Sequence, residues 1–165
     1  MQNSVIVPSR TNISLDITSQ AFIERYIKAL IHDPKRLTFA IKLYEEHIGN
    51  IGLKDICRKS GEAECFLEIG EKCYRGMGFG QLAMQELLNM AFFSLDLNCV
   101  RLDVLEFNHP AIKIYHRLGF IKESESRWHL DEFGQYWRIL RMSIDKNDWR
   151  PTPAMNLLKE EPIAR

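Results

Sequence analysis

The stretch Arg75-Gly76-Met77-Gly78-Phe79-Gly80 is the feature of this chain that most restricts its fold. It follows an apolar run at residues 65–69 and precedes a segment in which apolar residues recur with the 3.6-residue period of a helix. Alternate glycines let the backbone turn sharply and approach a ligand closely. A helix that starts there offers unpaired N–H groups and the positive end of its dipole. The pattern therefore predicts a site for a phosphate-bearing cofactor.

Length and charge exclude several other classes. A chain of 165 residues is expected to form one domain without disulfide or metal support. We assign residues 1–149 to that domain and 150–165 to a tail. Lys and Arg together number 22, as do Asp and Glu, so no basic excess favours nucleic acid or a membrane surface. No apolar run approaches the ~20 residues of a membrane span, and the N-terminus lacks a signal-peptide pattern. We expect a cytoplasmic protein.

The four cysteines do not form a metal or disulfide motif. None of Cys57, Cys65, Cys73 and Cys99 belongs to a C-x-x-C pair, and no histidine cluster has metal-ligand spacing. We therefore expect free thiols in a reducing compartment and no metal site.

The rest of the chain predicts an α/β (α+β) fold. Its sheet should be twisted and mostly antiparallel, with flanking helices and a central βαβ crossover from the strand at 63–69 to that at 99–107. The first residues, 5–7, form either a short strand or a loose arm. The expected elements are a helix at 18–31, a hairpin at 37–43 and 47–53, a strand at 63–69, a helix at 80–92, a strand at 99–107, a helix from Asn108, and two strands around a turn at 131–135.

The glycine turn does not fit two familiar phosphate motifs. A P-loop requires G-x-x-x-x-G-K-[ST], and the dinucleotide fingerprint requires G-x-G-x-x-G, whereas these glycines fall as G-x-G-x-G. What remains is Arg75-x-x-Gly78-x-Gly80. On its own this pattern is also compatible with a simple tight turn.

A second motif lies about 30 residues downstream. Residues 108–120 read N-x-x-A-x-x-x-Y-x-x-x-G-F. Together with the glycine turn, this motif resembles the GNAT N-acetyltransferase superfamily, and the resemblance covers roughly residues 20–149. Ala63-Glu64 and the late Gly134-Gln135-Tyr136 resemble the Rim-type branch, which acetylates protein N-termini. Close relatives acetylate polyamines and other small amines.

The resemblance implies acetyl-CoA as co-substrate, bound in a V-shaped opening between two strands. Its diphosphate should lie on backbone N–H groups of Arg75, Gly76, Met77, Gly78, Phe79 and Gly80. Its pantetheine amides should pair with the main chain near Glu68, Ile69 and Gly70, as an added strand would. Asn108 should contact the pantetheine arm, and it can also cap the helix that follows.

The resemblance also assigns catalytic roles. Tyr115 matches the residue that protonates the leaving thiolate, and its alternative role is packing in the core. The acceptor amine must lose a proton, for which Glu64 is the first candidate and Glu68, on the same strand face, the second. Both can also be ordinary solvent-facing carboxylates. His116 is expected on an exposed helix face.

Three aromatic residues of the last hairpin have two interpretations. Trp128, Tyr136 and Trp137 either line the amine pocket or pack within the hairpin, and we expect packing for at least two of them.

The leading hypothesis is direct acetyl transfer to a primary amine, first a protein N-terminal amine and second a polyamine or other small amine. A non-catalytic acyl-CoA-binding module is the third reading, because relatives carry a strand and helix ahead of the position of Ile13 that help to wall the substrate site. Here that wall is either shortened to residues 5–7, missing, or supplied by a partner chain.

We expect a small-molecule or peptide amine as partner, with a homodimer as an open alternative. A covalent route through Cys65 or Cys73 lacks a Cys–His spacing to support it.

Overall fold

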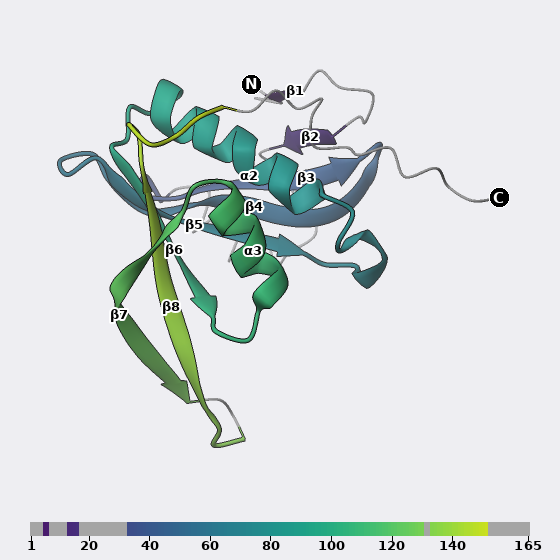
Figure 1. Ribbon diagram of the computed structural model, residues 1–165. Helices are drawn as coiled ribbons and strands as arrows, with labels where there is room; N and C mark the ends of the chain where they lie inside the picture. The colour runs from purple at the N-terminus through teal and green to yellow at the C-terminus, as the bar shows by residue number, and fades with distance from the viewer. Residues whose placement is uncertain (1–4, 7–12, 17–32, 131–132, 152–165) are drawn as a thin grey trace.

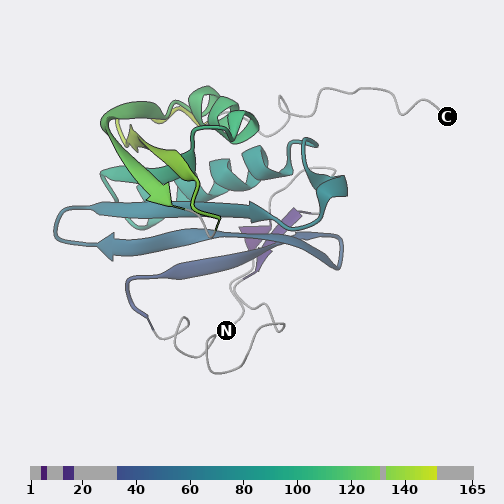
Figure 2. The same ribbon diagram turned by 90° about the horizontal axis from the view of Figure 1, so that it is seen from below.

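The computed structural model describes residues 5–6, 13–16, 33–130 and 133–151. The helix expected at 18–31 and most of the tail lie outside these residues. Within them, eight strands form one mixed sheet in the order β1-β2-β3-β4-β5-β6-β8-β7. Helices α2 and α3 lie on the same side of strands β3 to β5 (Figures 1 and 2). The predicted α/β fold with a mostly antiparallel sheet is confirmed.

The first five strands are joined in antiparallel pairs. The predicted hairpin is confirmed, although its second strand continues further than expected. The short strand at the N-terminus is also confirmed, whereas β2 was not predicted. The strands are β1 (Val5–Ile6), β2 (Ile13–Asp16), β3 (Leu37–Leu43), β4 (Glu46–Cys57) and β5 (Glu62–Ile69).

The predicted βαβ crossover follows. From β5 the chain passes through a short 3-10 turn, η1 (Lys72–Tyr74), into α2 (Phe79–Asn89), and returns as β6 (Cys99–Leu105), which runs parallel to β5. The helix expected to reach residue 92 ends at Asn89. A π turn, η2 (Met90–Ser94), replaces its last residues.

The last three elements complete the sheet. Helix α3 (His109–Arg117) leads into β7 (Ile121–Leu130), and β8 (Tyr136–Asp145) inserts between β6 and β7. In Figure 1 the far end of the β7–β8 hairpin extends beyond the rest of the sheet.

The core lies between the sheet and the two helices. Gly80 allows α2 to approach β5 closely, since a Cβ added there would lie 3.1 Å from Leu67 Cδ2. The core residues with no exposed surface include Leu87, Leu88, Ala91 and Phe92 after the glycine turn, and Ile41, Ile51, Leu53 and Val100 from the sheet. This packing fixes the start of α2 against the end of β5, which positions the site.

Candidate active site

A cleft opens between β5 and β6. The two strands pair only at Glu62↔Cys99, Ala63↔Val100 and Glu64↔Arg101, although β5 continues to Ile69 and β6 to Leu105. Each strand keeps its other neighbour, β4 or β8, over this length. The inner edges therefore diverge after Glu64, as Figure 1 shows. This is the V-shaped opening that the sequence resemblance implies.

The unpaired edge of β5 presents main-chain groups to this cleft. The N–H of Gly70 donates to the carbonyl of Ile48 on β4 at 2.9 Å. Because successive residues of a strand direct their N–H and C=O groups to opposite neighbours, the main chain of Glu68 also faces β4. Leu67 and Ile69 face the cleft instead. Of the three residues expected to pair with pantetheine amides, only Ile69 has main-chain groups directed toward the cleft. Leu67, which was not predicted, has the same orientation.

The glycine loop forms the wide end of the cleft. Gly76 and Gly78 have φ of 79° and 88°, and a Cβ added at either would meet nothing within 4 Å. Gly78 caps α2 without a side chain, so the first N–H groups of α2, from Phe79 onward, have no partner within the helix. Open space above unpaired amides at a helix start suits a diphosphate.

Arg75 serves this loop differently from expectation. Its exposed guanidinium donates to the carbonyl of Ile69 at 3.0 Å and to that of Gly70 at 2.9 Å. The side chain therefore closes the loop onto the end of β5. The backbone N–H of Arg75, which was expected to face the diphosphate, donates instead to the carbonyl of Lys72 at 3.1 Å. Met77, at the tip, is 55% exposed.

Helix α3 carries Tyr115, and Asn108 immediately precedes this helix. Asn108 caps α3 by accepting the N–H of Ala111 at 3.4 Å, so the expected capping role is confirmed. Two residues before the end of α3, Tyr115 is 8% exposed and packs against Phe120 with ring centroids 5.8 Å apart. Burial, with a smaller contribution from the neighbouring Cys65, raises the pKa of Tyr115 to about 12. The phenol therefore stays protonated near neutral pH, as a hydrogen-bond donor must.

The Cys65 thiol is buried beside Tyr115. Burial raises the pKa of Cys65 well above its ordinary value. A thiolate is the reactive form of cysteine, so the structure favours direct transfer over an acetyl-cysteine route. All four cysteines are free.

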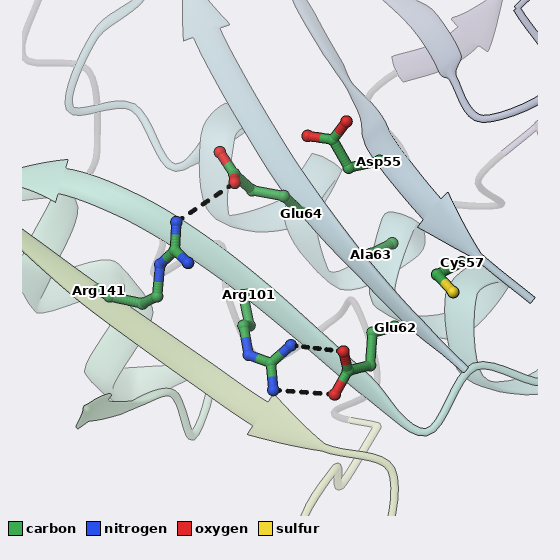
Figure 3. A pocket seen from close by; sticks show the side chains of 7 residues that line it. All are labelled: Asp55, Cys57, Glu62, Ala63, Glu64, Arg101 and Arg141. Atoms are coloured by element: carbon green, nitrogen blue, oxygen red, sulfur yellow. Dashed lines mark hydrogen bonds and ion pairs between the residues drawn. The ribbon is translucent and has the colours of Figure 1, made fainter. Parts of the chain in front are cut away.

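A charged pocket lies on the sheet face opposite the helices, where β5 and β6 are still paired (Figure 3). Its cavity volume is about 280 Å³. Arg101 donates to both oxygens of Glu62 at 2.8 and 2.9 Å, which lowers the pKa of Glu62. The lining residues are Asp55, Cys57, Glu62, Ala63, Glu64, Arg101 and Arg141.

Glu64, the first candidate base, is held by two cations. Its carboxylate lies 2.6 Å from Lys54 Nζ and 3.6 Å from Arg141, which also binds Asp103 through two bonds of 2.8 and 2.9 Å. Glu68 is exposed on the same face of β5 and lies further along the diverging edge. The pocket therefore adjoins the narrow end of the cleft at Glu64.

Asp55 differs from the other acids of the pocket. It sits in the bulge between Lys54 and Cys57 with a left-handed φ of 52°, and Figure 3 shows its carboxylate at the pocket beside Glu64. Among the described residues it has neither an ion-pair partner nor a hydrogen-bond partner for its side chain. Sequence reasoning missed Asp55, Arg101 and Arg141. The alternation of Arg101 and Asp103 with apolar residues of β6 was the signal that could have drawn attention to this face.

The three hairpin aromatics differ in how far they pack, and Trp128 remains 64% exposed. Trp137 makes an edge contact with Phe107, at 4.6 Å between centroids, and Arg138 lies over Trp128 at 5.8 Å. Tyr136 is 60% exposed. His116 is exposed, as predicted.

Two further observations concern the described residues only. They contain no group of three or more His, Cys, Asp or Glu side chains that could hold a metal ion. They also contain no helix long and apolar enough to cross a membrane.

Comparison with known proteins agrees with the fold. The model of the acetyltransferase (GNAT) domain family matches residues 8–121, and the chain therefore belongs to this family. An uncharacterized N-acetyltransferase, p20, of Bacillus licheniformis is 31% identical over 114 residues, which are 69% of this chain and 64% of p20. Spermidine N(1)-acetyltransferase of Escherichia coli strain K12 is 31% identical over 132 residues, or 78% of this chain and 70% of the enzyme.

A solved structure shares the architecture. Spermidine N-acetyltransferase of Vibrio cholerae, crystallised with CoA and spermine, superposes with a TM-score of 0.70 at 25% identity, covering 76% of this chain and 74% of that one. Membership in the Rim-type branch stays a prediction.

Proposed function

We propose that this chain is an acetyl-CoA-dependent N-acetyltransferase that transfers the acetyl group directly to a primary amine. The observation that carries the proposal is the divergence of β5 from β6, together with a buried Tyr115 beside Cys65 of β5 and an open glycine loop after β5. Acetyl-CoA supplies an activated acetyl thioester when bound. The chain's own groups fit it, since the main chain of Leu67 and Ile69 can pair with amides and the amides of residues 76–80 can receive a diphosphate.

Tyr115 is the proposed donor to the leaving sulfur. As the amine nitrogen bonds to the carbonyl carbon, the carbon–sulfur bond breaks and the sulfur gains negative charge. A phenol that keeps its proton can donate a hydrogen bond to that sulfur and stabilise it. This role is supported by the position of Tyr115 beside Cys65, which is one residue past the last β5–β6 pair.

A carboxylate of β5 is the proposed proton acceptor. Of the two carboxylates, Glu64 is nearer to Cys65, which is its neighbour in the chain. Protonation of Glu64 would, however, weaken its ion pairs with Lys54 and Arg141. Glu68 lies three residues beyond Cys65, about 10 Å along a strand, so it requires a water relay. Separate Glu64→Gln and Glu68→Gln variants identify the base by which one removes the acid limb of the pH–rate profile.

The acceptor is proposed to be a polyamine. The pocket beside Glu64 holds three carboxylates against two guanidinium groups, and Asp55 has no cation of its own among the described residues. A second, remote ammonium of a polyamine can occupy that position. Two of the similar proteins named above are spermidine acetyltransferases, which supports the same choice. A protein N-terminal amine, favoured by the Rim-type resemblance, is the second candidate.

Thiol release with acetyl-CoA tests the proposal against its alternatives. Spermidine and spermine should give turnover, and N-terminal peptides and aminoglycosides should give less. Preferential turnover of a peptide would identify the second candidate. Calorimetric binding of CoA without turnover of any amine would support a non-catalytic acyl-CoA-binding module instead.

A further inference from the structure

The segment between β5 and α2 is fastened at a second point besides Arg75. The hydroxyl of Tyr74 donates to Oε2 of Glu46 at 2.6 Å, across 28 positions of sequence. Glu46 is the first residue of β4 and follows the β3–β4 turn. This single hydrogen bond therefore ties the segment that leads into the glycine loop to a different hairpin. It also raises the pKa of Tyr74 to about 12, so the donor keeps its proton.

The Tyr74 ring contacts the other side of the loop. It meets the ring of Phe79 edge-on, with centroids 6.3 Å apart and an interplanar angle of 64°. Phe79 is the first residue of α2 and is buried. One side chain thus joins the β3–β4 turn to the start of the helix whose amides face the cleft.

We propose that Tyr74 and Glu46 form a latch that positions the glycine loop, residues 76–80, for the diphosphate of acetyl-CoA. This rests on the proposed function. A Cβ added at Gly76 or Gly78 would meet nothing within 4 Å, so no packing around these positions holds the loop. The loop is therefore held through its ends, and an end that is fixed beforehand reduces the ordering that binding requires. Tyr74 acts through the loop and is a positioning residue.

Charge repulsion alone predicts the opposite change in affinity for acetyl-CoA. Glu46 is a negative charge near a loop that would bind an anion, and repulsion alone would make its removal strengthen binding. The latch instead predicts that either Tyr74→Phe or Glu46→Ala weakens binding. Because both changes break the same bond, the double variant should lose no more than the larger single loss.

The experiment compares two acetyl donors. S-acetylpantetheine lacks the diphosphate but carries the same thioester, so it bypasses the loop. For Tyr74→Phe we expect KM for acetyl-CoA to rise about 10-fold, the scale of one hydrogen bond to a charged group, with kcat unchanged. The kcat/KM for S-acetylpantetheine should stay at the wild-type value. Tyr44→Phe and Glu45→Ala, in the same turn, are the matched controls and should change neither donor.

The outcomes distinguish a failure of the latch proposal from a failure of the proposed function. An equal loss with both donors, an unchanged KM for acetyl-CoA in Tyr74→Phe, or tighter binding in Glu46→Ala would each overturn the latch. If wild-type protein gave no calorimetric signal with CoA, the proposed function itself would fail.

Discussion

Replacing Tyr115 with Phe removes one buried hydroxyl beside Cys65 and leaves the ring. The ring packs against Phe120 and is 8% exposed, so the variant should keep the fold. The change tests whether the chain uses this hydroxyl in acetyl transfer or only buries it as part of the core.

The size of the loss follows from the pKa of the phenol. A phenol with a pKa of about 12 is a weaker acid than a thiol of about 8.5, and complete proton transfer to a thiolate would be uphill by roughly 5 kcal/mol. A hydrogen bond to the charged sulfur is therefore the more favourable contribution, worth about 1.5–3 kcal/mol. We expect kcat to fall by about 10- to 150-fold.

Thiol release at saturating polyamine measures the loss, and calorimetry with CoA measures binding. KM for acetyl-CoA should change little, because Tyr115 acts on the leaving sulfur. Tyr44→Phe, 66% exposed on the β3–β4 turn, is the matched control. An unchanged kcat in Tyr115→Phe, with intact CoA binding, would refute the donor role.

Three further perturbations have defined outcomes. Gly78→Ala should lower the free energy of unfolding by about 1–2 kcal/mol in urea denaturation, because a φ of 88° is strained for a residue with a Cβ. Gly70→Ala is the control and should leave the free energy of unfolding unchanged, because φ at Gly70 is not in the left-handed region. Asp55→Asn keeps a residue type that tolerates the left-handed φ. This change should raise KM for spermidine about 2- to 5-fold and leave KM for acetyl-CoA unchanged. An unchanged KM for spermidine would exclude Asp55 from acceptor binding. Stability should fall as pH rises from about 9 to 12, because burial raises the pKa of Cys99 to about 11 and that of Tyr115 to about 12, so the unfolded chain releases these protons first. Urea midpoints at pH 8 and 10.5 measure this fall, and equal midpoints would contradict it.

Local signals in the sequence were sufficient for most elements near the site. The glycine turn, the periodic face of α2 and the Asn108-His109-Pro110 helix start each depend on residues a few positions apart. The strand β2 had no such signal, and it forms against the outer edge of β3. The π turn after Asn89 was also missed, because its buried Ala91 and Phe92 continue the helical pattern.

The sequence by itself determined that a strand, a glycine loop and a helix would follow one another, and that Tyr115 would lie on the buried face of the next helix. Only the tertiary structure decided that β5 and β6 separate after Glu64, that the Arg75 guanidinium turns back onto Ile69, and that Glu64 is shared between two cations. Backbone conformation and side-chain periodicity are short-range properties. The partner of a strand edge or a charge is chosen among residues far apart in the chain, and the packing of the whole sheet decides it.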